Sequence, residues 1–535
     1  MAVITILCVA GGCGQLDWLR CWRPQPLLCP SWCRAKSETR GHPDGWLVPG
    51  RRVTMQVSQS TIPETDLMRC FVLLCFAVLS LAASSEAAAP VAIGSRLEPF
   101  IDRHLIESFS GNAELVMHRP KAAEVVLVTD KPWEGNTSAY YTVFRDDDRL
   151  RMYYRGSHAD SNMKGTHRQV TCYAESRDGI HWTKPELGQF EFEGSRKNNI
   201  VWDGIGTHCF SVFKDRNPKC RPEARYKAIS RGRPRGKRGL YIFESPDAIH
   251  WKLMADVPVI TEGAFDSQNL AFFDPHVGLY RAYHRSFVDG VRAIMTETSS
   301  DYRTWTKPVL LQYSKGTRNE HLYTNTVGNY PGADHILLGF PTRYLPKESS
   351  RVEPVLMTSR DGVHFHRWPD AVVPETAPRD RSGNRSNYMT SGVIHLPSRP
   401  GEFSVYATEA YYTGPDSRVR RFIFRKDGIA SVRARRGELT TRTLTFTGRQ
   451  LMLNHRSLPA VGQNRVAGSV QVELLDTAGR PIEGFALEDC IPLSGDQLSA
   501  RVRWKGQSNL SSLAGKPLKL RFVVRDSDLF SIRFQ

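Results

Sequence analysis

The chain has 535 residues, and its 72 Lys and Arg outnumber its 55 Asp and Glu, which gives a formal net charge of +17. The basic residues are scattered among acidic ones rather than gathered in a stripe, which argues against a nucleic-acid partner. Two interpretations of the net positive charge remain: it keeps the protein soluble, or it attracts an anionic polysaccharide partner of the sulfated or uronic type.

A segment near the N-terminus has the layout of a secretory signal peptide. Met68 and Arg69 begin a short basic region, residues 71–83 form an apolar run, and residues 87–89 are small alanines suited to cleavage. The run is too short to span a bilayer, and its polar flanks disfavour the alternative of a buried core helix. We expect a signal peptide over 68–89, a secreted or periplasmic protein with no stable membrane span after cleavage, and a mis-called or disordered extension over 1–67.

Cysteine usage excludes a disulfide-rich scaffold. Seven of the 11 Cys lie within residues 1–89, and the remaining four are Cys172, Cys209, Cys220 and Cys490. No pair has the close spacing of a zinc site. Cys209 and Cys220 are left open as either bridged or unpaired.

One phrase recurs four times, at intervals of 54 to 69 residues. The copies span 176–182, 245–251, 299–305 and 359–365, and each begins Ser-x-Asp and ends on an aromatic residue. A worn fifth copy lies at 425–430. Each copy follows an alternating strand, and roughly 40 to 50 residues is the size of a four-stranded propeller blade. The repeat therefore predicts a β-propeller.

Five blades follow from working outward from each copy. The first strands are expected at 137–144, 207–213, 266–273, 322–327 and 387–394. The second strands are expected at 150–155, 226–229, 279–284, 335–340 and 402–407. Beyond residue 436 the phrase stops, and alternating strands separated by turns predict a β-sandwich.

The predicted fold class is thus all-β, a five-bladed β-propeller followed by a C-terminal β-sandwich. The propeller is assigned to 131–435 and the sandwich to 436–535. A lead-in segment covers 90–130, where residues 100–106 are expected to form a short strand or helix.

Polar side chains gather at the starts of the five predicted first strands. In a propeller these starts meet at the mouth of the central funnel. Burying charges without partners is costly, so a converging set implies a ligand, a metal or mutual pairing. The set comprises Glu134, Asn136, His208, Asp266, Gln268, Asn269, Glu320, His321, Tyr323, Arg385, Asn387 and Tyr388.

Three carboxylates in this set suit glycoside hydrolysis, which needs a protonated acid and a second carboxyl group as nucleophile or base. We expect Glu320 to be the acid and Glu134 or Asp266 to be the nucleophile or base, with pKa values pushed apart. The other nine residues are expected to bind the substrate. His208 and His321 also suit a central divalent cation such as calcium, and Tyr140, Tyr323 and Tyr388 suit stacking on sugar rings.

Simpler interpretations stand beside these. Each carboxylate taken alone fits a loop cap or a solvated charge, and Arg155, Arg285 and Arg343 are placed to pair with them. The repeated aspartates and tryptophans belong to the fold, because identical roles in several blades suit a structural element. They are Asp178, Asp247, Asp301, Asp361, Trp182, Trp251 and Trp305.

The layout resembles the five-bladed propeller glycoside hydrolases of families 32 and 43 and their relatives, which include β-fructosidases, arabinofuranosidases and xylosidases. It also resembles secreted propeller proteins of planctomycete-type bacteria that are described as glycosyl-hydrolase-like, on the phrases at 182–188, 197–203 and 263–269. The Ser-x-Asp repeat is similar to the Asp-box of the six-bladed sialidases, with a different placement of Gly.

The catalytic motifs of family 32 are not matched. Its nucleophile lies in a Trp-Met-Asn-Asp-Pro run, where this chain has Trp133-Glu134-Gly135-Asn136. Its Arg-Asp-Pro is replaced by Thr207-His208-Cys209, and its Glu-Cys pair has no counterpart near Asp266. The three carboxylates therefore rest on their positions alone.

The resemblance implies a carbohydrate-active enzyme that hydrolyses a polysaccharide or oligosaccharide. Two alternatives stay open. One is a non-catalytic module for glycan binding or surface assembly, because fold does not dictate function. The other is a lyase or phosphorylase that acts on sugars.

Overall fold

The computed structural model describes residues 89–376, 387–412, 414–459 and 467–535. The predicted extension over 1–67 and almost all of the predicted signal peptide lie outside these residues. The described part is built from β-strands and three short 3-10 helices, η1 (Pro222–Ala224), η2 (Pro234–Gly236) and η3 (Ser511–Leu513). In this part of the chain, no helix is long and apolar enough to cross a membrane.

Four sheets are made of strands that are consecutive in the sequence. Sheet 1 contains β6 (Ala139–Asp146), β7 (Arg149–Gly156), β8 (Val170–Ser176), β9 (Trp182–Thr183) and β10 (Ile200–Trp202). Sheet 2 contains β11 (Ser211–Lys214), β12 (Tyr226–Gly232), β13 (Gly239–Ser245) and β14 (Lys252–Leu253). Sheet 3 contains β15 (Leu270–Asp274), β16 (Leu279–Val288), β17 (Val291–Ser299) and β18 (Val309–Leu310).

Sheet 4 has more strands than the other three. It contains β19 (Gln312–Tyr313), β20 (His321–Leu322), β21 (Gly328–Tyr330), β22 (Ala333–Gly339), β23 (Thr342–Leu345), β24 (Arg351–Ser359) and β25 (His364–Ala371). Its strands β20 and β23 form a side branch on β24.

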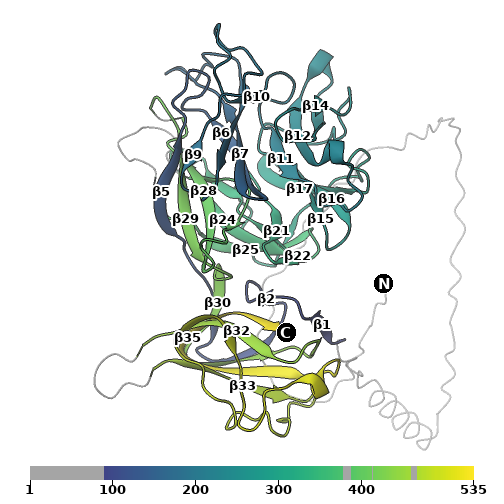
Figure 1. The fold of residues 1–535 in the computed structure, drawn as a ribbon, viewed down its shortest axis with the longest axis vertical. Coiled ribbons are helices and arrows are strands. Elements are labelled where there is room, and N and C mark those ends of the chain that lie inside the picture. The colour runs from purple at the N-terminus through teal and green to yellow at the C-terminus, as the bar shows by residue number, and fades with distance from the viewer. Residues whose placement is uncertain (1–88, 377–386, 413, 460–466) are drawn as a thin grey trace, which may run out of the picture. The chain divides into compact units, whose positions relative to one another are not determined.

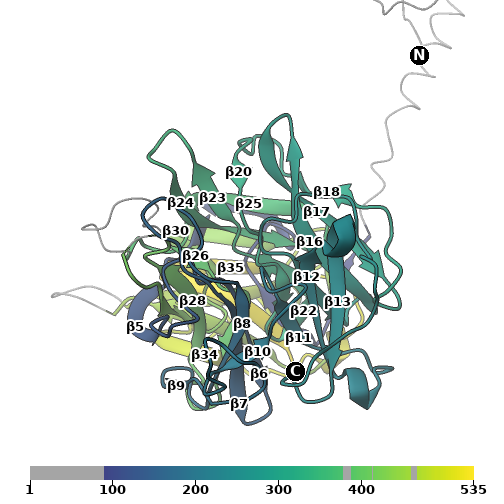
Figure 2. The ribbon, with the colours of Figure 1, turned by 90° about the horizontal axis from the view of Figure 1, so that it is seen from above.

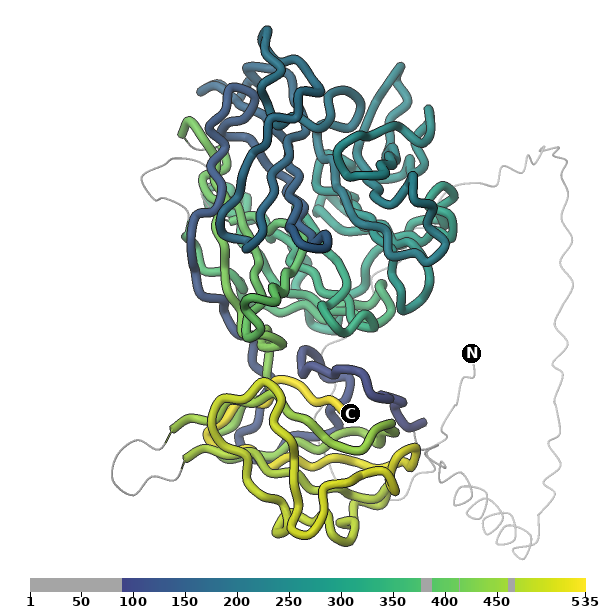
Figure 3. The backbone as a smooth tube through the Cα atoms, viewed as in Figure 1, coloured from purple at the N-terminus to yellow at the C-terminus, as the bar shows by residue number. Residues whose placement is uncertain are grey.

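Sheet 5 combines segments from distant parts of the chain. It contains β26 (Tyr388–Met389), β27 (Ile394–His395), β28 (Glu402–Glu409), β29 (Arg418–Arg425) and β5 (Lys121–Val128). β5 pairs antiparallel with β29, so that Val128 lies opposite Arg418 (Figures 1 and 3). Sheet 5 is also joined to sheet 1, because the Val143 and Ser391 amides donate to the carbonyls of Ser391 and Tyr141 at 2.8 and 2.9 Å. The sheets thus have the propeller-like arrangement that the repeat predicts (Figure 2).

The C-terminal strands form a sheet of their own with the start of the described chain. It contains β2 (Glu98–Pro99), β3 (Ile106–Gly111), β4 (Glu114–Met117), β30 (Ala430–Thr441), β32 (Leu451–Ser457), β33 (Ser469–Leu475), β34 (Asp496–Arg501) and β35 (Lys519–Phe534). Parallel strands β1 (Val91–Gly94) and β31 (Leu444–Phe446) lie beside it as a pair. These strands share one apolar core that includes Ile93, Val432, Leu453 and Phe522.

The predicted lead-in segment is therefore divided, since β1 to β4 join the C-terminal strands and β5 joins sheet 5. The predicted strand or helix at 100–106 is mostly turn, with only Ile106 in a strand. Cys209 and Cys220, for which a bridge was left open, are both free thiols.

The repeated phrase is a turn in which the side chains replace missing backbone partners. In the fourth copy the Asp361 carboxylate accepts the amides of Val363 and His364 at 2.8 Å, and the Ser359 hydroxyl accepts the amide of Gly362 at 2.9 Å. The same bonds recur in the other three copies. The third residue after Ser needs a left-handed backbone, with φ of 86° at Gly362 and 69° at Ala248. The interpretation of the repeated aspartates as structural agrees with this geometry.

Tyrosines fasten three of these turns to the neighbouring sheet. The Tyr153 hydroxyl of sheet 1 donates to the Ala248 carbonyl of sheet 2 at 2.8 Å, and Tyr283 of sheet 3 donates to Gly362 of sheet 4 at 3.0 Å. Tyr406 of sheet 5 donates to the Gly179 carbonyl of sheet 1 at 2.8 Å. The repeat thus holds adjacent sheets together and also links the last sheet to the first.

We expect Asp361→Ala to lower the free energy of unfolding by about 1 kcal/mol, because two amides lose their acceptor. Against the opposing effect of burial, the amide hydrogen bonds lower the pKa of Asp361 to about 2. Its contribution is therefore present above the ordinary aspartate pKa and is lost as the pH falls towards 2. Denaturant titration at pH 7 and pH 3 measures this, with exposed Asp370→Ala as control. An equal effect of the two variants at pH 7 would contradict the structural role.

Candidate functional site

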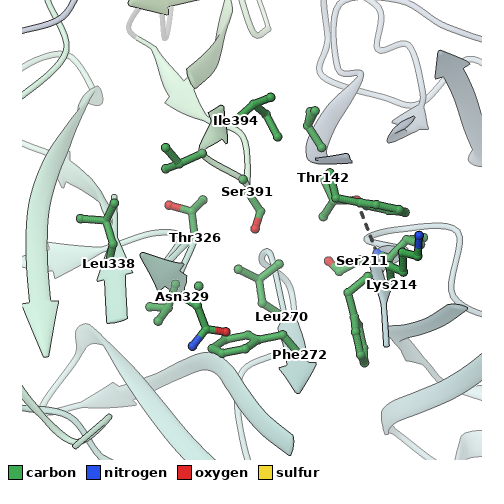
Figure 4. A pocket seen from close by; sticks show the side chains of 18 of the residues that line it. Thr142, Ser211, Lys214, Leu270, Phe272, Thr326, Asn329, Leu338, Ser391 and Ile394 are labelled. Carbon is green, nitrogen blue, oxygen red and sulfur yellow. Dashed lines mark hydrogen bonds between the residues drawn. The ribbon is translucent and has the colours of Figure 1, made fainter. Parts of the chain in front are cut away.

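The first strands of the five sheets surround a central space (Figure 4), which we call the channel. Side chains from all five sheets meet at the end of this channel where the first strands begin. Tyr140 belongs to sheet 1, His208 precedes β11, and Asp266 precedes β15. Tyr323 directly follows β20 of sheet 4, and Tyr388 begins β26 of sheet 5. Two residues at the ends of second strands join them, Arg155 of β7 and Tyr411 just after β28. We call these seven residues the channel cluster.

Tyrosine rings form the floor of the channel cluster. The ring of Tyr388 lies 5.8 Å from that of Tyr323 and 5.3 Å from that of Tyr411. Tyr140 lies 5.4 Å from the ring of His208. The free space among the tyrosines is about 10 Å³, which barely admits a water molecule, so the rings close this end of the channel.

Tyr140 has a backbone conformation that bulky residues rarely adopt. Its φ is 59°, and the register of β6 against β7 shifts between Ala139 and Thr142. Tyr412, next to the cluster, has a φ of 60°. Strained backbone of this kind persists where the surrounding structure enforces it, and it is common at ligand-binding sites.

A chain of polar contacts runs from Arg155 through His208 to Asp266. Arg155 Nη1 lies 3.2 Å from His208 Nδ1, and His208 Nε2 lies 2.8 Å from Asp266 Oδ1. Burial, with Arg155 and Arg231 nearby, lowers the pKa of His208 to about 4 against the effect of Asp266. A neutral imidazole with its proton on Nε2 donates to Asp266, and its Nδ1 accepts from Arg155; Gln169 Oε1 lies 3.0 Å from the same Nδ1.

Asp266 is the accessible carboxylate of the cluster. Its side chain is 64% exposed, and Arg231 Nη1 lies 2.6 Å from Oδ1. The hydrogen bond from His208, together with the charges of Arg231 and Arg285, holds the pKa of Asp266 well below its usual range. The group is thus an anion at neutral pH, as a nucleophile or base requires.

The other two predicted carboxylates have separate partners. Both oxygens of Glu320 lie 3.2 Å from guanidinium nitrogens, one from Arg343 and the other from Arg367, and its side chain is 17% exposed. Glu134 is buried, and its oxygens are held at 2.6 Å by Lys184 Nζ and by the Tyr154 hydroxyl. Burial raises the pKa of Glu134, and Lys184 opposes this. Among the described residues, none is a side-chain partner of more than one of these three carboxylates.

Most of the predicted binding residues outside the cluster bond to the protein's own backbone. Asn136 donates to the carbonyls of Ala159 and Gly414, Gln268 to that of Tyr141, and Asn269 to those of Phe265 and Ser267. The bonds of Gln268 and Asn269 shape the loop before β15, which begins at Leu270, later than predicted; β11 also begins later, at Ser211.

Three predicted binding residues remain. Asn387 and His321 have contacts outside the channel cluster, and Arg385 is not among the described residues. Asn387 bonds Thr376 through its side chain, and His321 lies on β20, where it accepts the Arg292 amide at 3.2 Å. In the described part of the chain, no group of three or more His, Cys, Asp or Glu is placed to hold a metal ion such as the calcium considered from the sequence.

A second cavity extends along the first strands themselves, from the first residues of β11 and β15 onward. It has a volume of about 270 Å³. Thr142, Ser211, Leu270, Thr326 and Ser391 line it, one from each sheet (Figure 4). Besides apolar and hydroxyl-bearing residues, the described lining includes Arg145, Lys214, Arg216 and His395, and it contains no carboxylate. The chemistry of the channel therefore belongs to the cluster end.

The site includes Tyr411 and four arginines that were not predicted as site residues: Arg155, Arg231, Arg285 and Arg292. Arg155 and Tyr411 lie at or beyond the ends of second strands, and Ala139 at the start of β6 is opposite Arg155. In an antiparallel pair the end of one strand lies beside the start of the other. Aromatic and basic residues at the ends of the second strands would thus have indicated in the sequence that Arg155 and Tyr411 belong to the site.

No protein-family model matches the chain, and no curated protein matches it in sequence. Among solved structures it is similar to a glycoside hydrolase, with 12% identity and a TM-score of 0.41 over 57% of this chain and 92% of that one. It is also similar to a β-1,2-mannobiose phosphorylase from Listeria innocua, with 13% identity and a TM-score of 0.43 over 58% and 98%. A third is the catalytic domain of a Coprinopsis cinerea GH62 α-L-arabinofuranosidase, with 9% identity and a TM-score of 0.38 over 57% and 97%. Likenesses this weak carry no argument about function.

We expect Glu134→Gln and Lys184→Gln each to lower the free energy of unfolding by about 2 kcal/mol, because a charge-assisted hydrogen bond is lost inside the protein. The double variant should be much less destabilised than the sum of the two single variants. Denaturant unfolding of the four proteins measures this cycle. Additive effects would contradict a direct ion pair.

We expect the His208→Gln variant to show a shallower loss of stability than the parent protein as the pH falls from about 6.5 to about 4. The folded pKa of His208 is lowered to about 4 from 6.5, so the unfolded chain binds the proton more readily within this window. Lowering the pH therefore destabilises the parent protein through His208, and this contribution is absent from the variant. Unfolding free energies at several pH values test it, and identical slopes would contradict the neutral, buried imidazole.

Proposed function

We propose that the chain is a secreted carbohydrate-active protein that binds a glycan at the channel cluster and hydrolyses a glycosidic bond there. The observation that supports this most is the meeting of tyrosine rings with Arg155, His208 and Asp266 at one end of the channel. Aromatic faces suit the apolar faces of sugar rings, while arginine, imidazole and carboxylate groups suit sugar hydroxyls. The signal peptide over 68–89 is part of this proposal.

The proposed scaffold is a five-bladed propeller followed by a β-sandwich. Sheets 1 to 4 are four blades, and sheet 5 is the fifth, completed by β5 from the N-terminal side. The C-terminal sheet folds over its own core as the sandwich, with β30 and β35 as its long strands.

The proposed chemistry assigns different roles to the three carboxylates. Asp266, which is exposed and held as an anion, serves as nucleophile or base. Glu320, 17% exposed, serves as the general acid. Glu134 has a completely buried side chain, and both of its oxygens are hydrogen-bonded, one to Lys184 and one to Tyr154. Its role is therefore to stabilise the protein rather than to act on the substrate.

A non-catalytic glycan-binding function is the second candidate. It is favoured by one observation: arginines occupy both oxygens of Glu320, the atoms that a general acid would offer to the leaving group. In that case the channel cluster binds a glycan and releases it unchanged.

Reducing-sugar release from a panel of plant and algal polysaccharides distinguishes the two functions. If the protein is a hydrolase, Asp266→Asn and Glu320→Gln should each reduce the rate at least about 100-fold, because each removes a group that acts on the substrate. The exposed Asp148→Asn variant is a matched control and should retain the rate.

The outcomes separate clearly. Glycan binding without release of sugar, and unchanged binding in Glu320→Gln, would support the binding function. Cleavage that depends on added phosphate would identify a phosphorylase. If no glycan of the panel binds or is cleaved, the carbohydrate function is wrong.

A further inference from the structure

We propose that the channel cluster and the arginines around it recognise an anionic sugar, one that carries a carboxylate or a sulfate. This inference rests on the proposed glycan-binding function and names the class of ligand. It is carried by an excess of guanidinium groups over carboxylates around the tyrosine floor.

Arg155 is the most deeply placed of these groups. Only 3% of the residue is exposed, and its guanidinium lies 4.8 Å from the centre of the Tyr140 ring. Its nitrogens donate to the Thr137 carbonyl at 2.6 Å and to the Tyr411 hydroxyl at 2.9 Å, while Nε has no hydrogen-bond partner. In the described part of the chain its partners are neutral, so none of them balances its charge.

Two further arginines lie over Tyr323, a different ring of the floor from the one that Arg155 contacts. The guanidinium groups of Arg285 and Arg292 each lie 5.3 Å from the centre of the Tyr323 ring. Arg292 Nε is buried without a hydrogen-bond partner. Among the described residues, neither arginine has a carboxylate within ion-pair distance, and the same holds for Arg155.

Asp266 does not balance this charge. Its carboxylate is already shared by His208 at 2.8 Å and Arg231 at 2.6 Å. Among the described residues, the four arginines thus face one carboxylate, in contrast to Arg343, whose charge is met by Glu320 and Glu353.

A buried or half-buried charge without a counter-ion is costly, and an anionic ligand removes that cost when it binds. The guanidinium group offers paired N–H donors that match the oxygens of a carboxylate or sulfate. The tyrosines supply a face for the sugar ring, and the arginines above Tyr323 and Tyr140 supply the charge. An anionic glycan meets both requirements, whereas a neutral glycan meets only the first.

Matched pairs of polymers test this inference. Binding to polygalacturonate is compared with binding to the same polymer after reduction of its carboxyl groups, and binding to a sulfated galactan with binding to its desulfated form. We expect at least about tenfold tighter binding to the anionic member of one pair, and weaker binding as NaCl is raised. Whichever pair shows the difference identifies carboxylate or sulfate as the recognised group.

Two substitutions place the effect in the protein. Arg292→Gln should weaken binding of the anionic polymer at least about tenfold and leave the neutral member nearly unchanged. Arg216→Gln makes the same charge change at the opposite end of the channel, where Arg216 pairs with Asp334, and should have no effect. Circular dichroism and thermal unfolding confirm that both variants are folded.

The possible results keep the two proposals apart. If neutral and anionic members bind equally, or if Arg292→Gln and Arg216→Gln weaken binding alike, the anionic inference is wrong and glycan binding stands. If no member of either pair binds while a neutral glycan of the wider panel does, the anionic inference is wrong and glycan binding stands. If no glycan of the panel binds either, the glycan function itself is wrong, and the inference falls with it.

Discussion

The pairing of β5 with β29 is the constraint on which the channel depends. Sheets 1 to 4 each form from neighbouring strands, but sheet 5 is completed by residues that lie almost 300 positions earlier in the chain. Backbone bonds between Ser391 and β6, and the Tyr406 bond to Gly179, join sheet 5 to sheet 1. The side chains of the channel cluster hold their mutual distances because sheet 1 and sheet 5 are joined in this way.

Within this frame, the cluster shows how polar groups are retained in the middle of an all-β protein. His208 is neutral because burial disfavours its charge. It therefore bridges the Arg155 cation and the Asp266 anion by hydrogen bonds without adding a charge itself. Arg155 keeps its charge by contacts with a carbonyl, a hydroxyl, an imidazole and an aromatic face. Such an arrangement is costly for stability alone, and natural proteins tolerate costs of this kind at binding sites.

How much the sequence predicts depends on how local the interaction is. The Ser-x-Asp turns are predictable because donors and acceptors lie within five residues of one another. The starts of the first strands led to His208, Asp266, Tyr323 and Tyr388, which the structure brings together. The ion pair of Glu134 with Lys184 and the place of β5 could not be predicted, because their partners are distant in sequence and have no shared pattern. Arg155 was considered only as a partner for a carboxylate, and the structure gives it none among the described residues.

The strands that precede β6 have a consequence for how the protein is made. β1 to β4 pair with β30, β31 and β35, and β5 pairs with β29, so the first described residues find their partners only after the strands of sheets 1 to 4 have been synthesised. Contacts of such long sequence separation form slowly. Until β29 leaves the ribosome, the edge of β5 that it covers has no native neighbour and is open to pairing with other chains. A chaperone that shields this segment during translation would thus act on the one step that local folding cannot complete.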